Sequence, residues 1–450
     1  MENTKEIIQS LIDCAVNEII SLIAKDLKQL NFSDIVRTTQ KTVNNLGVSL
    51  IEQIVKIIDE NYNKQRDKHA VILRHTKTRK MVSRMGEINL TRRLYFNKAT
   101  GKYFFAVDEL LNMERYSRIE SELKTKLIND ATLTSYGKAS KLSNGCVSRQ
   151  TVHNLVKGVA PKRLEVQAKG LKAVEQIYIE ADEDHIHLNN GKSAEVKLVY
   201  VHEGRERINR GRTALMGARY FVSISNGNEI WDCVTDYLYA QYDTGNAEIH
   251  LSGDGANWIK QGLIAIPKAQ YHLDKFHVYK SVTDATAGDK RLRNQIINSI
   301  KLGDSKSVQV LYMQRWGGLG TARARNRLYD SLQYIENNFD SIDLTAENNC
   351  SAEGHVSHVL SARLSSRPMA WSLAGAEKMA QLRAFYFNGG NFSELYQGRT
   401  EPATEILNGY NVHAIRENYK VDHSIPSGRI VGLDAVYDDV GRFLRYIVKK

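Results

Sequence analysis

Hydrophobic residues recur at helical spacing along the first sixty residues of the chain. Between residues 5 and 62, Ile, Leu and Val return every three or four positions, and Lys, Asp and Glu fill many of the positions between them. A stripe of this kind is typical of amphipathic helices that bury one face. The pattern predicts a helical N-terminal region over residues 1–75, for DNA binding or dimerisation, with simple core packing as the plainer role.

The hydrophobic period shortens to two after residue 78. Alternating pieces at 86–90 and 93–96, with a turn at 98–101, predict a small, basic, β-rich segment over residues 76–115. Such a basic run is usually a solvated surface, and phosphate contact is the alternative. The side chains that would make these contacts are Arg79, Lys80, Arg84, Arg92 and Arg93.

A helix-turn-helix pattern lies within residues 116–170. Ser148 is placed to cap a short second helix that packs inward through Val152 and Leu155. A helix of this kind reads base edges in the major groove of DNA, while chance look-alikes are common in helical domains. The polar side chains that would reach the bases are Arg149, Gln150 and Asn154.

Strand and helix patterns alternate from residue 171 onward. Strands are predicted at 177–187, 196–201, 220–224, 248–252 and 269–273, and helices at 230–242 and 256–263. The order βββαβαβ, followed by a helix with a last carboxylate, is that of the ribonuclease H-like fold. We therefore expect a multidomain α + α/β protein with a mixed sheet. Its catalytic parts would be 171–280 and 346–400, separated by a basic helical insertion at 281–345 and followed by a C-terminal segment at 401–450.

Composition adds a polyanionic partner to this picture. Hydrophobic residues make up 42% of the 450 residues and charged residues 25%, as in an ordinary globular protein of several domains. The net charge is +11 and the isoelectric point is about 9.2. An excess of this size favours nucleic acid binding, although a charge that only aids solubility has the same composition.

Cysteine usage and hydropathy indicate the compartment. The four cysteines, Cys14, Cys146, Cys233 and Cys350, are far apart, which disfavours a zinc ribbon and a disulfide framework. The N-terminus is charged, and no apolar run approaches about 18 residues, so neither secretion nor membrane insertion is expected. We predict a cytoplasmic protein without a membrane partner.

Acidic residues follow the predicted strands at several places. Cleavage of a phosphodiester develops charge on the attacking and leaving oxygens, which two divalent cations can stabilise, and Mg²⁺ prefers carboxylate ligands. Alternation along the first strand places Asp182 and Asp184 on one face. Asp254 lies between Gly253 and Gly255, where backbone crowding is low, although a single Asp after a strand is more often a helix cap.

Two further pieces carry groups of the same chemistry. Asp274 and His277 are three residues apart, directly after the fifth strand, and Glu353 opens a helix beyond the insertion. In the insertion, Trp316 beside Arg315 would stack on an unpaired base, with core packing as the other role of this tryptophan. Two arginines would neutralise phosphates near the acids, or are simply exposed: Arg363 and Arg367.

Together these pieces resemble a known family. Residues 179–185, 253–259, 273–277 and 353–358, with 365–368, are similar to motifs of the ISLre-type bacterial insertion-sequence transposases, within the Mutator-like DDE transposase superfamily. The resemblance implies that two Mg²⁺ or Mn²⁺ ions are held by Asp182, Asp254 and Glu353. It also identifies Asp274 and His277 as a supporting signature. Asp184 and Glu377 are the alternatives for the first and third ligands.

The resemblance further implies an activity and its partners. A DDE transposase cleaves the ends of its element by metal-dependent hydrolysis and joins them to target DNA by transesterification. The expected partners are double-stranded DNA, both terminal inverted repeats and target, and further copies of the chain in a homodimer or larger assembly near the bacterial nucleoid. Two alternatives stay open: an inactive DNA-binding regulator with the same fold, and a ribonuclease H-like nuclease that cuts without joining.

Overall fold

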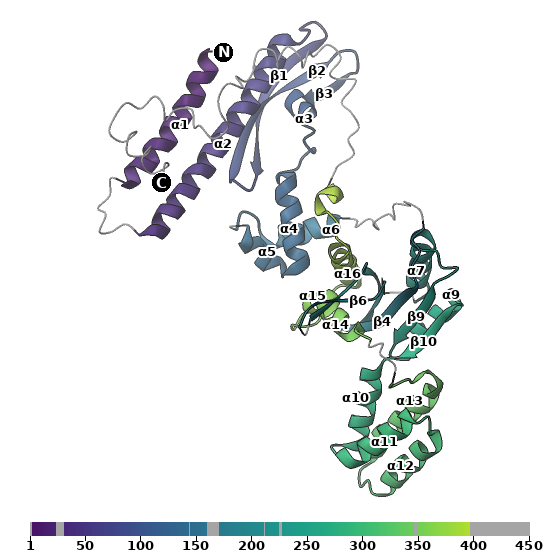
Figure 1. Ribbon diagram of the computed structural model, residues 1–450. Helices are drawn as coiled ribbons and strands as arrows, with labels where there is room; N and C mark the ends of the chain where they lie inside the picture. Colours follow the sequence, from purple (N-terminus) through teal and green to yellow (C-terminus); the bar gives the residue numbers. More distant parts are fainter. Residues whose placement is uncertain are drawn as a thin grey trace. The chain divides into compact units, whose positions relative to one another are not determined.

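The computed structural model describes residues 2–23, 31–143, 145–159, 171–210, 212–224, 227–345 and 350–396 (Figure 1). Within these ranges the chain divides into two units. One is built from residues up to 80 with 88–117, and the other from 81–87 with residues 118 onward. The predicted C-terminal segment, 401–450, lies outside the described residues.

The first unit contains two long helices and a small sheet. Its helices are α1 (Glu2–Ile23), α2 (Phe32–Gln65) and the short α3 (Ala106–Leu110). The strands β1 (Val71–Val82), β2 (Glu87–Asn97) and β3 (Lys102–Phe105) pair in the order β1-β2-β3. Tyr62 of α2 packs edge-on against Tyr95 of β2, with ring centroids 5.1 Å apart. The predicted helices and β-rich segment are thus confirmed.

Three arginines of this unit are not placed as expected for phosphate contact. Arg92 is buried, pairs with Asp108, and stacks on the Phe105 ring at 4.1 Å. Arg79 pairs with the same carboxylate at 3.3 Å, and Arg93 lies 2.6 Å from Asp59 of α2. Internal acids engage all three guanidinium groups, because a buried cation needs a partner, and they hold the sheet to its helices.

A five-stranded mixed sheet organises the second unit. The order is β10-β9-β4-β5-β8, in which β4 is antiparallel to β5 and β5 to β8, while β9 runs parallel to both β4 and β10. All five predicted strands are confirmed, at β4 (Gln176–His187), β5 (Ser193–His202), β8 (Arg219–Ser223), β9 (Glu248–Gly253) and β10 (Ala269–Leu273). The sequence pattern missed the exposed hairpin β6 (Arg205–Asn209) and β7 (Arg212–Leu215).

Alternation along β4 divides its side chains between the two faces of the sheet. Ile177, Ile179 and Ala181 are fully buried among side chains of three helices, α7 (Gly227–Gln241), α8 (Asn257–Lys260) and α9 (Gly262–Ala265). Glu180 and Asp182, which alternate with these residues, therefore point to the opposite face of the sheet.

A helical insertion follows β10, as predicted. It consists of α10 (Lys275–Thr286), α11 (Lys290–Lys301), α12 (Ser305–Gly317), α13 (Ala322–Asn337) and a 3₁₀ turn, η1 (Phe339–Ser341) (Figure 1). These helices share a core to which Leu273 of β10 also contributes. The helices begin at residue 275, before the predicted boundary at 281, because Asp274 caps α10: its carboxylate accepts a hydrogen bond from the amide of Phe276 at 3.0 Å.

The remaining helices share one core with the second sheet face. They are α4 (Ser121–Leu133), α5 (Tyr136–Leu142), α6 (Arg149–Gly158), α14 (Ala352–Val356), a π-helical turn η2 (Ser357–Ser361), α15 (Ala362–Leu364), α16 (Leu373–Phe387) and η3 (Phe392–Tyr396). Buried residues of α4 and α6 cluster with Ile186 and Leu198 of the sheet. The helix-turn-helix is therefore not a separate domain in its described part, since it packs into the core of the sheet.

The structure bears on the cysteines and on membrane insertion. None of the four cysteines, all within the described ranges, forms a disulfide. Among the described helices, none has both the length and the apolar character to cross a membrane.

Candidate metal centre

Asp182 lies on β4, and Asp254 directly follows the neighbouring parallel strand β9. The pairing of β4 with β9 runs from Gln176 and Glu248 to Glu180 and Ser252, and two more residues along each strand lead to the two aspartates. Neighbouring strands are about 4.8 Å apart, so the two side chains are within reach of each other.

Glycine makes this close approach possible. A Cβ atom on Gly253 would lie 3.0 Å from the carbonyl oxygen of Ala181 and 2.8 Å from the side chain of Ile259. Gly255 adopts a φ of +98°, which L side chains rarely tolerate. The two glycines that flank Asp254 thus bring the end of β9 against β4 and turn the chain away from the sheet.

The carboxylate of Asp182 is buried and only partly satisfied. One oxygen accepts the amide hydrogen of Glu183 at 2.8 Å, while Oδ2 has no hydrogen-bond partner among the described residues and almost no exposed surface. Burial raises the pKa of Asp182 to about 6, and the charges of Asp254 and Glu353 add to the rise. A buried carboxylate oxygen without a donor is costly, and a bound cation would satisfy it.

Glu353 and His277 form a compact group with Asp182. One ligand atom from each of Asp182, His277 and Glu353 lies within 4.8 Å of the others. Glu353 is exposed at the start of α14, and His277 is half-buried on α10. The structure therefore brings together groups from a strand, the insertion and the final helices.

His277 is oriented by Asp274. The imidazole Nδ1 hydrogen-bonds the Oδ2 atom of Asp274 at 3.0 Å, and this bond raises the pKa of His277 although burial acts against it. The second ring nitrogen is then the one left for a cation or a proton. Carboxylate–histidine pairs of this kind orient metal ligands in many proteins. From the sequence His277 had only a supporting role, since its spacing from Asp274 does not show what the ring faces.

The two alternative acids lie outside this group. Both carboxylate oxygens of Asp184 are within 2.9 Å of the hydroxyl of Ser365, which donates to them. Glu377 is half-buried on α16 and does not join the group around Asp182. The geometry favours Asp182 over Asp184 and Glu353 over Glu377, because only the favoured acids converge.

The donor set fits divalent cations. Carboxylates suit Mg²⁺ and Mn²⁺, and an imidazole suits Mn²⁺ better than Mg²⁺. Together with the unsatisfied oxygen of Asp182, these groups are suited to bind a divalent cation. Asp182, Glu353 and His277 are the residues that would hold an ion. Asp254, the predicted second ligand, does not join this group, although its charge acts on both Asp182 and His277.

A second buried acid, Glu180, is fully engaged on the same sheet face. Its carboxylate accepts hydrogen bonds from Tyr200, from Nε2 of His202 at 3.1 Å, from Arg205 at 2.8 Å and from the amide of Ser351 at 2.6 Å. Burial alone would raise the pKa of Glu180, but these hydrogen bonds outweigh it and lower the pKa to about 2. The sequence pattern did not identify this network, because its donors come from distant segments.

The predicted DNA-contact residues fall into two groups. Arg149, Gln150 and Asn154 are exposed on α6, where Ser148 caps the helix through a 3.1 Å bond from the amide of Thr151, as predicted. Arg367 is also exposed.

Two other predicted contact residues require correction. Arg363 is buried, donates to the carbonyl of Ala131 at 2.9 Å, and stacks on the rings of Tyr136 and Trp371, so it joins helices and does not face solvent. Trp316 is 42% exposed, so the core role considered for it is wrong. Arg315 beside it is half-buried.

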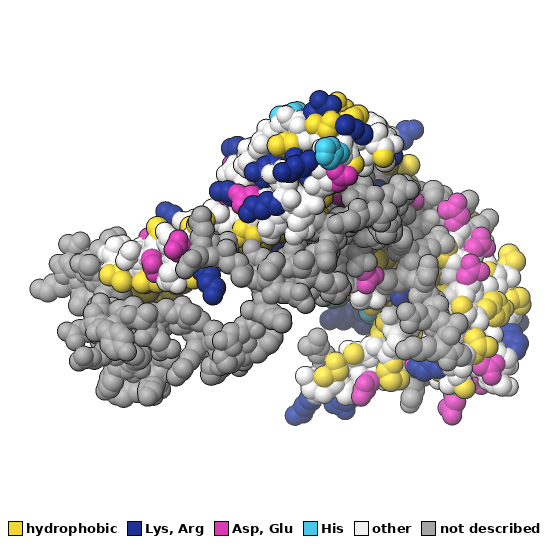
Figure 2. Space-filling model, turned by 90° about the horizontal axis from the view of Figure 1, so that it is seen from above, with side chains coloured by type: hydrophobic (Ala, Val, Ile, Leu, Met, Phe, Trp, Pro, Cys, Tyr) yellow, Lys and Arg dark blue, Asp and Glu magenta, His cyan; other side chains and the backbone are white. Residues whose placement is uncertain are grey.

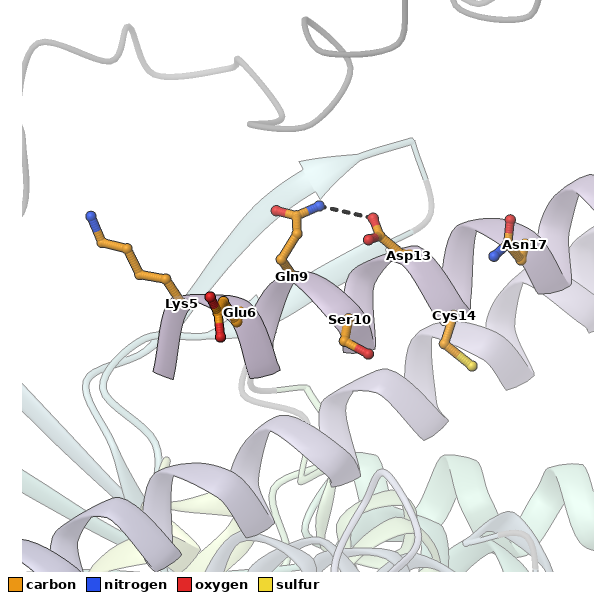
Figure 3. A pocket seen from close by; sticks show the side chains of 7 residues that line it. All are labelled: Lys5, Glu6, Gln9, Ser10, Asp13, Cys14 and Asn17. Atoms are coloured by element: carbon orange, nitrogen blue, oxygen red, sulfur yellow. Dashed lines mark hydrogen bonds between the residues drawn. The ribbon is translucent and has the colours of Figure 1, made fainter. Parts of the chain in front are cut away.

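Basic side chains are numerous on the face shown in Figure 2, with acidic ones among them. A hollow on α1, lined by Lys5, Glu6, Gln9, Ser10, Asp13, Cys14 and Asn17, is formed by one helix alone (Figure 3). Its side chains lie in a row, with Gln9 bonded to Asp13 at 2.8 Å, and no other described element contributes to its lining. Such a surface does not provide the convergent groups of a binding site.

Comparisons with known proteins identify the family. The Uncharacterised protein family (UPF0236) matches residues 25–401. UPF0236 protein TTE2489 of Caldanaerobacter subterraneus subsp. tengcongensis is 36% identical over 383 residues, which cover 83% of this chain and 82% of the relative. A second protein of that organism, whose name joins eleven locus designations, is 35% identical over 379 residues, 82% of this chain and 81% of its own.

A more distant relative comes from another genus. The UPF0236 protein in the vanSb 3′ region of Streptococcus gallolyticus is 22% identical over 392 residues, which cover 82% of this chain and 86% of the relative. Because the family match covers most of the chain, and the first relatives exceed 30% identity over most of both lengths, the chain belongs to the UPF0236 family.

Proposed function

We propose that this protein is a DNA transposase with a ribonuclease H-like catalytic fold. The strand arrangement supports the fold: β4, β5 and β8 form an antiparallel meander, and β9 and β10 extend the sheet in parallel from the other side of β4. In such a fold one catalytic acid lies on the first strand and another directly follows the fourth, which here are Asp182 on β4 and Asp254 after β9.

One observation carries the proposal: the buried carboxylate of Asp182, with an unsatisfied oxygen, meets Glu353 and His277 within 4.8 Å and has Asp254 at the adjacent strand end. Clusters of acids in a half-buried site are costly unless a cation neutralises them. A purely structural cluster would be expected to carry its own counter-charge, as Glu180 does with Arg205.

Divalent cations in this site would stabilise the charge that develops on the attacking and leaving oxygens of a phosphodiester. The chain's own residues supply the rest. Asp182 and Glu353 would bind the cations and so orient the phosphodiester. The hydrogen bond to Asp274 orients His277, whose other ring nitrogen can accept a proton. The exposed polar face of α6 offers Arg149, Gln150 and Asn154 to DNA.

The relatives give a second, independent argument for a transposase. Several relatives belong to one organism, and one name joins eleven locus designations. Multiple copies of a gene in one genome are the trace that transposition leaves. This observation favours a transposase, as the motif resemblance implies, over a nuclease of fixed location.

The test is cleavage of the element's own ends. Labelled duplexes taken from the DNA on either side of the coding sequence are incubated with the full-length chain and Mg²⁺ or Mn²⁺. We expect specific nicks or breaks with the unsubstituted chain and at least a thousandfold loss with Asp254→Asn. Asp330→Asn, which changes an exposed acid of α13, is the matched control and should cleave normally.

Two results would contradict the proposal in different ways. Equal and negligible cleavage by the unsubstituted chain and Asp254→Asn would favour the inactive DNA-binding regulator. Cleavage without joined products, in a strand-transfer assay with pre-cut ends and plasmid target, would favour the nuclease. The transposase requires both cleavage and joining.

A further inference from the structure

Glu353 meets Asp182 although the whole helical insertion separates them in the chain. Glu353 lies in a short helix, α14, which starts at Ala352. Helices of this length have little stability of their own, so contacts with the rest of the protein must fix their position. The contact that does so here lies two residues before Glu353.

Ser351 is bound by the carboxylate of Glu180. The amide of Ser351 donates to Oε2 of Glu180 at 2.6 Å, and its hydroxyl lies 3.0 Å from the same oxygen. Tyr200 donates to this oxygen as well, and its own hydroxyl is 3.0 Å from that of Ser351. The start of α14 is therefore held to β4 and β5 by charge-assisted hydrogen bonds, which are the strong ones.

The two anchored segments carry the candidate ligands at matching positions. Glu180 precedes Asp182 by two residues on the same face of β4, and Ser351 precedes Glu353 by two residues at the start of α14. A displacement of Ser351 therefore moves Glu353 relative to Asp182. The anchor is rigid because Glu180 is 3% exposed and fixed from its other side by His202 and Arg205.

Glu180 does not have the free oxygen of a ligand. Oε1 accepts from His202 and Arg205, and Oε2 accepts from Tyr200 and Ser351. Among the described residues that could together hold a metal ion, Asp182, His277 and Glu353 form a group and Glu180 does not. Its chemistry is that of an anchor for other residues.

We propose that Glu180 is a positioning residue, which fixes Glu353 against Asp182 by holding Ser351 at the start of α14. The inference rests on the proposed function for the role of the two acids, but the anchor itself is a property of the fold. The two parts can be measured separately.

The anchor is tested by hydrogen–deuterium exchange of the full chain, read by mass spectrometry on peptides that cover residues 350–356. Glu180→Gln should speed exchange there by at least about tenfold, since a charged acceptor is lost. Ser351→Ala removes the hydrogen bonds of the hydroxyl to Glu180, Tyr200 and Arg205 but keeps the amide bond to Glu180, so it should have a smaller effect. The control is Glu203→Gln, which removes a partly buried acid paired with Lys172 at 2.6 Å and should leave these peptides unchanged.

Positioning is tested by Mn²⁺ binding, measured by the loss of the free-ion signal in electron paramagnetic resonance. We expect Glu180→Gln to weaken binding by about 10- to 100-fold, the usual effect of residues that orient metal ligands. The same change should add little in a Glu353→Gln background, because the two residues act through one ligand. Glu203→Gln should not weaken binding in either background.

Two outcomes would overturn the inference: unchanged exchange at 350–356 in Glu180→Gln, or an equal loss of Mn²⁺ affinity with and without Glu353. If the unsubstituted chain binds no Mn²⁺, the metal part of the proposed function is wrong, and exchange alone decides whether Glu180 anchors α14. Should Glu180→Gln fail to fold, Ser351→Ala with the same two measurements decides the question.

Discussion

Asp274 binds the imidazole of His277 and caps the helix that carries it. Oδ2 is 3.0 Å from Nδ1 of His277, while Oδ1 accepts the amide hydrogen of Phe276 at 3.0 Å. The amide of Asp274 in turn donates to the carbonyl of Gly253 at 2.8 Å, directly before Asp254. Asp274 thus contacts the end of β9, caps the first helix of the insertion and orients His277.

This arrangement predicts how metal binding depends on pH. A cation competes with the proton on His277, and the bond to Asp274 raises the pKa of the imidazole. Asp274→Asn removes the charge that raises this pKa while Asn still caps the helix well. The acid side of the Mn²⁺-binding profile should therefore move to lower pH, although the ring is held less firmly and affinity at pH 8 falls.

The measurement is Mn²⁺ affinity between pH 5.5 and 8.5 for both proteins. His277→Gln is the comparison variant, and its profile should lack the histidine's titration altogether. A shift of the Asp274→Asn profile to higher pH would contradict the proposed link between these residues.

The buried carboxylate of Asp182 should lower the free energy of unfolding of the metal-free protein. Its pKa is raised to about 6 in the folded chain, above the ordinary value of 3.8. The unfolded chain therefore releases this proton at lower pH than the folded chain does. Stability falls as pH rises from about 4 to about 6 and stays lowered above that range. Asp182→Asn removes the charge and should stabilise the metal-free protein by about 1–3 kcal/mol at pH 7.5.

Urea denaturation in the presence of a chelator checks this prediction. The difference between the two proteins should disappear near pH 4, where Asp182 is neutral in the folded chain. Added Mn²⁺ should stabilise only the unsubstituted protein. Asp330→Asn, on the exposed face of α13, should leave stability unchanged at both pH values.

The sequence predicted the two faces of β4 well because side chains alternate strictly along a strand. The apolar residues Ile177, Ile179 and Ala181 identified the core face of β4, which placed Asp182 on the other face. The two glycines around Asp254 predicted a close turn at the end of β9, as observed. The insertion was predicted because its residues are basic, poor in turn signals and interrupt the alternation of strands and helices.

Long-range docking could not be predicted in the same way. His277 joins the acids only because α10 packs where it does, and Glu180 is satisfied by donors from β5, β6 and residue 351. The hairpin of β6 and β7 was missed because its residues are mostly polar and its first strand is exposed throughout. Arg363 could be expected at the surface from its charge alone, whereas three contacts in the fold bury it.

Because Arg363 is buried, we expect its substitution to lower the stability of the protein and not its affinity for DNA. Arg363→Ala leaves the carbonyl of Ala131 without its donor and removes the stacking on Tyr136 and Trp371. We expect the free energy of unfolding to fall by about 2–4 kcal/mol. Arg367→Ala, at an exposed position four residues later, should change it by less than about 0.5 kcal/mol. Chemical denaturation of both variants tests the prediction, and similar losses would contradict it.

Substitutions on the exposed face of α6 should instead lower the affinity for DNA. Arg149 is exposed in the first turn of the helix, beside Gln150, whose side chain bonds that of Asn154 at 3.0 Å. Arg149→Ala should weaken binding to the element's end by about tenfold without changing stability. If Arg149 contacts a phosphate, the salt dependence of binding also falls by about one ion and random DNA is affected equally. If it contacts a base, the loss is confined to the specific end.

Binding is measured by fluorescence anisotropy at several salt concentrations, with Lys268→Ala as the control. Lys268 is also basic and exposed, but it lies before β10 and far along the chain from α6. Equal losses in the two variants would show that affinity reflects only the total positive charge. The helix-turn-helix would then have no special role, because a recognition helix must contribute more than its charge. A loss specific to Arg149 would instead place DNA on the exposed face of α6, in the unit that also carries the acids.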